Sequence, residues 1–158
     1  MPHLLVKLYD LPEIESASQF ATRTGITIRR AISPEKHVVT DWVQQTFNEA
    51  WKSECEIAFA RSPISCLLAI EQSQLIGFAC YDVTMKGFFG PTGVDKQARG
   101  KGIGKTLLLH ALHSMKQEGY GYAIIGGAGP VEFYAKWCDA IPIEGSEPGI
   151  YRGVLKRP

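Results

Sequence analysis

The stretch from residue 99 to residue 105 combines three glycines with three basic side chains, a composition suited to holding an anion. It reads Arg99-Gly100-Lys101-Gly102-Ile103-Gly104-Lys105. Glycine leaves the backbone N–H groups unobstructed, so a ligand can approach them closely. Apolar spacing predicts a helix directly after this stretch, and the first N–H groups of a helix are unpaired and partly positive. We therefore predict a cradle for a phosphate group here.

Two common phosphate-binding patterns fit this stretch incompletely. In the nucleotide-binding pattern Gly-x-x-x-x-Gly-Lys-[Ser/Thr], Gly104-Lys105-Thr106 matches the end, but Arg99 stands where the first glycine belongs. In the dinucleotide pattern Gly-x-Gly-x-x-Gly, Gly100 and Gly102 match, but Lys105 stands where the last glycine belongs. Neither pattern accounts for the stretch.

A third pattern, Arg/Gln-x-x-Gly-x-Gly/Ala, fits Arg99 through Gly104 at each fixed position. By this pattern, the strand before it and the helix after it, the chain resembles the GCN5-related N-acetyltransferase (GNAT) family. The resemblance implies that the backbone amides of residues 99–105 bind the pyrophosphate of coenzyme A and that acetyl-CoA is the donor. It also implies that the backbone of Val94 pairs with the pantetheine arm, much as an added strand would.

A second resemblance to this family lies in Phe133-Tyr134-Ala135-Lys136, which is similar to the family's Phe-Tyr-x-Lys helix. It implies that Tyr134 assists the departing thiolate; the alternative is a core tyrosine with a bonded hydroxyl. One departure concerns the start of this helix, where many members carry an asparagine and this chain has Gly126-Gly127-Ala128-Gly129-Pro130. The pantetheine arm is then expected to be held there by main chain.

The general base is the least defined part of the predicted site. Many relatives carry a glutamate on the strand before the glycine loop, but residues 88–94 contain no carboxylate. Asp82, late in the preceding strand, is the candidate, with Glu54 and Glu56 on an earlier helix as alternatives. His110 and His113 share one helix face without a nearby carboxylate in the sequence, so we expect no metal site.

The elements that must position these residues follow from apolar periodicity and turn residues. We expect strands over residues 26–32, 64–71, 75–83, 88–94, 122–125, 140–143 and 150–155, and helices over 33–47, 51–61, 103–119 and 130–137. Gly90-Pro91 interrupts the fourth strand, which is therefore expected to be bulged or at an edge. Residues 11–25 carry no clear signal.

This order predicts an α/β fold with a mixed, mostly antiparallel central sheet and flanking helices. It resembles the acyl-CoA N-acyltransferase fold of the GNAT family over residues 26–155, within a single domain over residues 1–158. The four cysteines show no metal-ligand spacing and are expected to be small buried hydrophobes.

The bulk composition identifies no partner and only argues against some classes of partner. A net charge of +1 predicts neither nucleic acid nor an anionic membrane as partner. The first residues lack the pattern of a signal peptide, so a cytoplasmic protein is expected. The resemblance implies acetyl transfer to an amine of a small molecule or peptide; a homodimer is compatible with the sequence. The alternative function is a non-catalytic acyl-CoA binding or sensing module.

Overall fold

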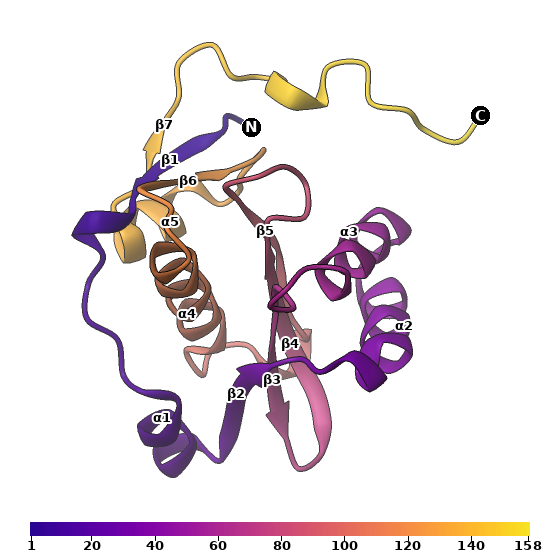
Figure 1. Cartoon of the computed structure of the whole chain (residues 1–158), viewed down its shortest axis with the longest axis vertical. Helices are drawn as coiled ribbons and strands as arrows, with labels where there is room; N and C mark the ends of the chain where they lie inside the picture. Colours follow the sequence, from indigo (N-terminus) through magenta and orange to yellow (C-terminus); the bar gives the residue numbers. More distant parts are fainter.

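The chain forms one central sheet with helices on both of its faces (Figure 1). The computed structural model describes residues 1–158. Its strands are β1 (Leu4–Lys7), β2 (Ile26–Arg30), β3 (Cys66–Glu71), β4 (Gln74–Tyr81), β5 (Phe88–Val94), β6 (Tyr122–Ile125) and β7 (Ile141–Pro142). Its helices are α1 (Ala17–Thr24), α2 (Lys36–Thr46), α3 (Glu49–Phe59), α4 (Ile103–Gln117) and α5 (Val131–Cys138).

The seven strands lie in the order β2-β3-β4-β5-β6-β1-β7. All neighbours are antiparallel except β5 and β6, which are parallel. The two parallel strands are joined by α4, as a crossover between parallel strands requires. The expected mixed, mostly antiparallel sheet is therefore confirmed.

Alternation along β3 and β4 divides the core between the two faces of the sheet. Successive side chains of a strand point to opposite faces. Leu67 and Tyr81 pack in the core that contains α4, whereas Leu68 and Phe78 pack in the core that contains α2 and α3. Figure 1 shows α4 on one side of these strands and the pair α2 and α3 on the other. At its start, α4 lies close to the end of β5, since a Cβ on Gly104 would lie 3.8 Å from the Val94 side chain.

Strand β5 is bulged where Gly90-Pro91 interrupts it. Ala79 lies opposite Thr92 and Tyr81 lies opposite Phe89, so β5 has one residue more than β4 over this interval. Of the two expected arrangements, a bulge or an edge position, the bulge is confirmed. On its other side β5 pairs with β6 only through residues 88 and 89. From the bulge onward, residues 90–94 have no strand partner on the β6 side, and the sheet is split open at this point.

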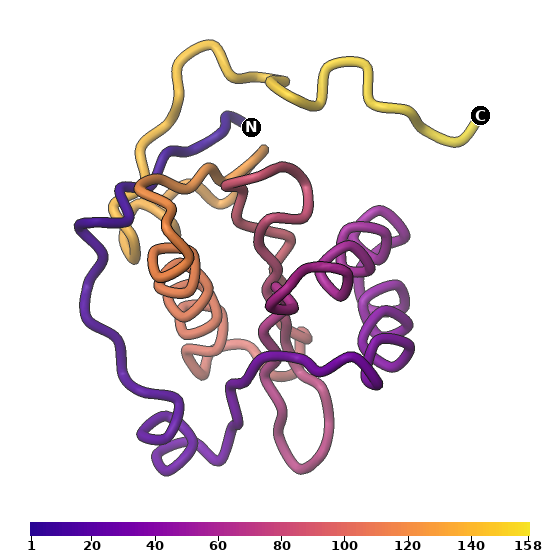
Figure 2. The backbone as a smooth tube through the Cα atoms, viewed as in Figure 1, coloured from indigo at the N-terminus to yellow at the C-terminus, as the bar shows by residue number.

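The first 25 residues form elements that the sequence left unassigned. Helix α1 begins with a capping box between Ser16 and Gln19 and ends at Gly25, whose φ is 77°. Strand β1 lies between β6 and β7. The expected last strand at residues 150–155 is wrong: a 3-10 turn forms at Gly149–Tyr151, and the tail has no strand partner. Figure 2 shows this tail running past the N-terminus along one end of the molecule.

Candidate active site

A cleft of about 920 Å³ opens where β5 and β6 part. One wall is the unpaired edge of β5 at residues 92–94. The second wall is the glycine loop with the start of α4, and the third is α5 with the loop before it. The split in the sheet therefore places the predicted phosphate cradle, the predicted pantetheine edge and Tyr134 around one cavity.

The glycine loop presents a continuous row of free amides. The backbone N–H groups of residues 99–105 donate no hydrogen bond within the chain, and no side chain caps the N-terminus of α4. Gly100 and Gly102 have φ angles of 89° and 78°, a left-handed conformation that favours glycine. Free amides at a helix N-terminus bind anions through hydrogen bonds and the helix dipole. The free amides and the helix N-terminus are therefore suited to an anion.

Basic side chains surround this loop but are only loosely engaged. The Lys101 ammonium lies 3.5 Å from a Glu71 carboxylate oxygen on β3. The Lys105 ammonium lies 3.8 Å from the ring centre of Trp137, and Arg99 donates a 3.4 Å hydrogen bond to the Val94 carbonyl. All three bases are at least partly exposed, so they add positive charge near the amides without filling the cleft.

Tyr134 lies on α5 and is nearly buried, with 7% of its surface exposed. Its ring packs edge-on against Phe133 and Phe89. Burial, with a smaller contribution from Cys138, raises the pKa of the Tyr134 hydroxyl to about 12. The hydroxyl has no hydrogen-bond partner within the chain, in contrast to the bonded core tyrosine that was the alternative. An unpartnered hydroxyl at a cavity wall is available to a ligand.

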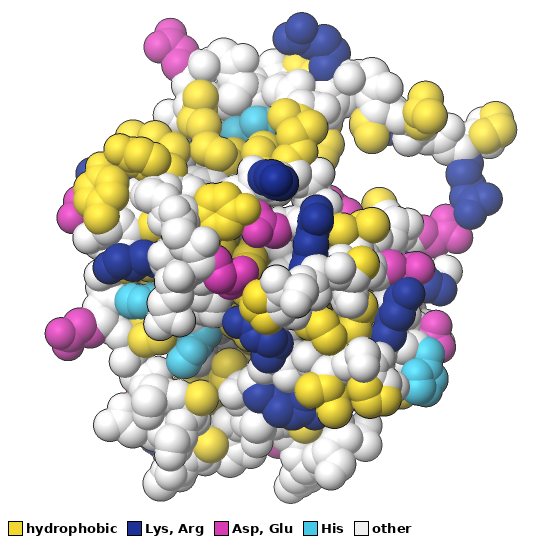
Figure 3. Space-filling model, viewed as in Figure 1, with side chains coloured by type: hydrophobic (Ala, Val, Ile, Leu, Met, Phe, Trp, Pro, Cys, Tyr) yellow, Lys and Arg dark blue, Asp and Glu magenta, His cyan; other side chains and the backbone are white.

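A second cavity, of about 960 Å³, lies on the other side of Tyr134. It is bounded by α3, the β5 bulge, the loop at residues 125–129 and the C-terminal tail. Figure 3 shows the gap that the tail leaves as it arches away from the body. Thr92, Gly129 and Tyr134 line both cavities. A group bound in one cavity can therefore meet a group bound in the other at Tyr134.

Both acidic and basic side chains line each of the two cavities. Figure 3 shows basic and acidic side chains interspersed over this face of the molecule. Glu54, which is half-buried, lines the second cavity and accepts a hydrogen bond from the Thr84 hydroxyl. Burial raises the pKa of Glu54, although the bond from Thr84 acts in the opposite direction. A carboxylate with a raised pKa inside a cleft is a candidate general base.

Asp82 lies outside both cavities, which is a correction to its choice as the base candidate. Its carboxylate accepts bonds from the Gly87 amide at 2.7 Å and the Tyr120 hydroxyl at 2.8 Å. These bonds hold the turn between β4 and β5, with Asp82 itself at a φ of 59°. Glu56 lines neither cavity. Of the three carboxylates considered, only Glu54 reaches the space next to Tyr134.

The two histidines of α4 hold the N-terminal segment. The ring Nε2 of His110 lies 3.1 Å from the Glu15 carbonyl, and that of His113 lies 2.9 Å from the Pro12 carbonyl. Since a carbonyl only accepts, each Nε2 carries the proton. His110 also lines the first cavity, where burial lowers its pKa. Both rings are thus engaged in packing the segment before α1.

The model of the acetyltransferase (GNAT) family matches residues 36–139. This match spans more than half of the chain and includes the glycine loop and Tyr134, and the chain belongs to this family. No curated protein matches the sequence. None of the helices combines the length and apolar character that crossing a bilayer requires.

Solved structures of three acetyltransferases share the fold. The GCN5-related glucosamine N-acetyltransferase region of a fungal multi-domain GH3 beta-N-acetylglucosaminidase superposes with a TM-score of 0.72 at 16% identity, covering 90% of this chain and 19% of that chain. A GCN5-related N-acetyltransferase from Sphaerobacter thermophilus gives 0.64 at 18% identity, covering 90% and 48%. One from Kribbella flavida gives 0.57 at 18% identity, covering 89% and 53%. The chain thus spans about half or less of the length of these proteins.

Proposed function

We propose that this chain is an acetyl-CoA-dependent N-acetyltransferase that acts on a primary amine of a small molecule or peptide. The observation that carries the proposal is the meeting of two cavities at Tyr134, one of which ends in free loop amides. Acetyl transfer between two bound substrates needs such a junction, because the reacting atoms must be held within about 3–3.5 Å.

The first cavity is assigned to the donor. The amides of residues 99–105 would bind its pyrophosphate, with Arg99, Lys101 and Lys105 adding charge. The unpaired edge of β5 up to Val94 would pair with the amides of the pantetheine arm. Hydrogen bonds to charged groups contribute about 1.5–3 kcal/mol each, so four loop amides would contribute about 6–12 kcal/mol. Association costs about 4–15 kcal/mol, which this contribution barely offsets. The β5 edge is therefore expected to add to the binding of the donor.

The second cavity is assigned to the amine, which Glu54 would help to deprotonate. Glu54 would accept the ammonium proton and pass it to solvent, and the neutral amine would then attack the thioester carbonyl, so that the new C–N bond forms and the C–S bond breaks. The second proton, which the nitrogen loses as the amide forms, passes to Glu54, and the departing thiolate takes a hydrogen bond from the Tyr134 hydroxyl. A free primary amine of pKa about 10.4 is almost entirely protonated at pH 7, so a nearby base has a defined task.

Donor binding is tested by melting the protein with acetyl-CoA. A ligand at about 100 times its Kd stabilises the folded state by about 2.7 kcal/mol, which is a clear rise in melting temperature. Two comparison probes are acetyl-dephospho-CoA, which lacks only the 3′-phosphate, and acetylpantetheine, which also lacks the pyrophosphate and the adenosine. Unchanged melting in millimolar acetyl-CoA would contradict the proposal.

Catalysis is tested by thiol release from acetyl-CoA with a panel of amines. The expected result is release that depends on one class of amine and falls strongly in a Glu54→Gln variant that still binds acetyl-CoA. Binding of acetyl-CoA without release on any amine would instead identify a non-catalytic acyl-CoA module.

A further inference from the structure

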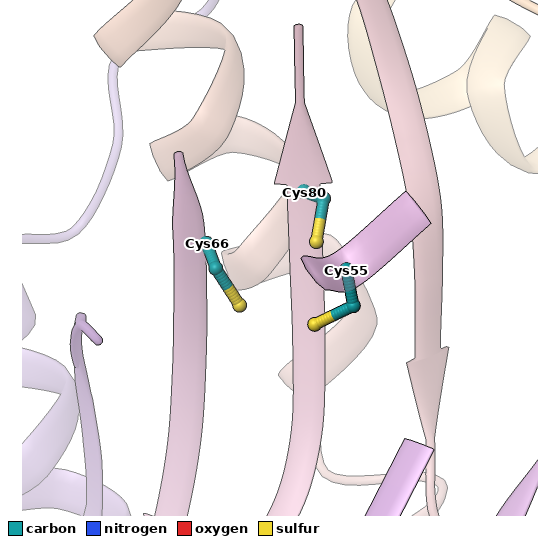
Figure 4. Close-up of side chains that lie close together, drawn as sticks. All are labelled: Cys55, Cys66 and Cys80. Carbon is teal, nitrogen blue, oxygen red and sulfur yellow. The ribbon is translucent and has the colours of Figure 1, made fainter. Parts of the chain in front are cut away.

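Three cysteines from three elements meet in the core, away from both cavities. Cys55 of α3, Cys66 of β3 and Cys80 of β4 are each fully buried and free of disulfide bonds. Their sulfur atoms all lie within 4.8 Å of one another. Figure 4 shows the three side chains pointing into one space between the two strands and the helix. Their separation in sequence hides this cluster from any spacing pattern.

The sheet register fixes two of the three sulfurs. Cys66 lies opposite Cys80 in the antiparallel pair of β3 and β4. The Tyr81 amide donates to the Ser65 carbonyl at 3.1 Å, so residues 66 and 80 form the neighbouring non-hydrogen-bonded pair, whose Cα atoms lie about 4.5 Å apart. Both side chains lie in the core between the sheet and the helices α2 and α3. Cys55 of α3 faces them across this core.

The number and kind of ligands select among metal ions. Soft sulfur ligands select Cu(I), zinc and iron–sulfur clusters. A structural zinc site takes four ligands in a tetrahedron, and no fourth His, Cys, Asp or Glu joins the three cysteines. The three cysteines belong to an apolar core cluster that includes Val39, Val43 and Phe78, and none of these three supplies a ligand. An ion that accepts three sulfurs in a plane fits this set.

We propose that Cys55, Cys66 and Cys80 form a binding site for Cu(I). On binding, the three S–H bonds break and three Cu–S bonds form, because the thiolate is the form of cysteine that binds a metal. The three released protons go to solvent, and neither copper nor sulfur changes oxidation state. The bound site has a net charge of −2, whose cost in an apolar core the three Cu–S bonds must offset, so binding is expected to weaken as the pH falls.

The test is an anaerobic titration of the full chain with Cu(I) in competition with a chromophoric Cu(I) chelator. We expect one equivalent to bind, with an affinity at least tenfold higher than in Cys55→Ala, Cys66→Ala or Cys80→Ala. Cys138→Ala is the matched control, because Cys138 is also a buried free cysteine but lies on α5 outside the cluster. Equal affinity in the wild type and Cys55→Ala, or an equal loss in Cys138→Ala, would overturn the proposal.

X-ray absorption at the copper edge provides a measurement that needs no variant to fold. Three sulfur neighbours around copper in the wild-type protein are expected. Two sulfurs, or a shell that includes nitrogen or oxygen, would place copper elsewhere and refute the site. A parallel titration with Zn(II) checks the choice of ion: tighter binding of zinc than of Cu(I) would contradict the three-coordinate argument.

Discussion

Removing the Tyr134 hydroxyl tests how the leaving thiolate is stabilised. The pKa of this hydroxyl is raised to about 12, chiefly by burial. A thiol has a pKa of about 8.5, and each unit of difference corresponds to about 1.36 kcal/mol, so full proton transfer from Tyr134 would be uphill by about 5 kcal/mol. A thiolate next to the hydroxyl would raise the pKa of Tyr134 further. The hydroxyl is therefore expected to donate a hydrogen bond and to keep its proton.

That role sets the size of the effect of Tyr134→Phe. A hydrogen bond to a charged group is worth about 1.5–3 kcal/mol, which corresponds to a fall in kcat of about 10- to 150-fold. The KM for acetyl-CoA should change little, because the bond forms fully only as the thiolate develops. The assay is steady-state thiol release at saturating amine.

The matched control is Tyr122→Phe, the same chemical change on an exposed residue of β6. Wild-type turnover in Tyr134→Phe would return Tyr134 to a packing role. A loss beyond about 10⁴-fold would exceed what one hydrogen bond supplies and would show the pKa argument to be wrong.

Three further predictions concern the loop, the base and an ion pair. Gly102→Val should abolish the rise in melting temperature with acetyl-CoA, because Gly102 has a φ of 78° that valine adopts only with strain; calorimetric binding checks this. Glu54→Gln should lower kcat/KM about 10²- to 10⁴-fold, whereas Asp82→Asn should lower it about tenfold at most, measured as pH–rate profiles. Bonds from Arg29 lower the pKa of Glu35 from 4.5 to about 2. The ionised carboxylate thus stabilises the fold above pH 4.5, and this contribution is lost as the pH falls towards 2. Glu35→Gln should accordingly lower the melting temperature at pH 7, with a difference that shrinks on acidification.

The parts of the fold that the sequence predicted are those determined by local rules. The strands expected over 64–71 and 75–83 form as the antiparallel pair β3 and β4, and Gln72 and Ser73 take positive φ angles of 49° and 61° in the two-residue turn between them. The apolar spacing from Ile103 to Met115 gave the bounds of α4 to within two residues. Strand β1 was missed because its partners β6 and β7 lie more than 100 residues away in the sequence. No local signal identifies such pairing.

The candidate site likewise contains residues that local motifs predicted and a residue that they did not. The glycine loop and Tyr134 are parts of contiguous motifs, so their types and spacing were sufficient to single them out. The base is different, because its position depends on how α3 lies across the split sheet. Asp82 is close in sequence to β5, but a turn binds its carboxylate, whereas Glu54 is distant in sequence and reaches the second cavity. Only three-dimensional packing separates these two carboxylates.

The bulge at Gly90-Pro91 connects the fold to the proposed chemistry. Before the bulge, β5 pairs with both β4 and β6, and the sheet is closed. After it, β5 keeps only β4, so its free edge can pair with a donor arm that ends at the glycine loop. The bulge residues themselves line the second cavity, and Thr92 borders both cavities. Gly93 adds a requirement from the other face, because a Cβ there would lie 2.3 Å from the Phe47 ring. The residues that interrupt regular pairing in this strand are thus the ones that create the junction at which the acetyl group would pass between the two substrates.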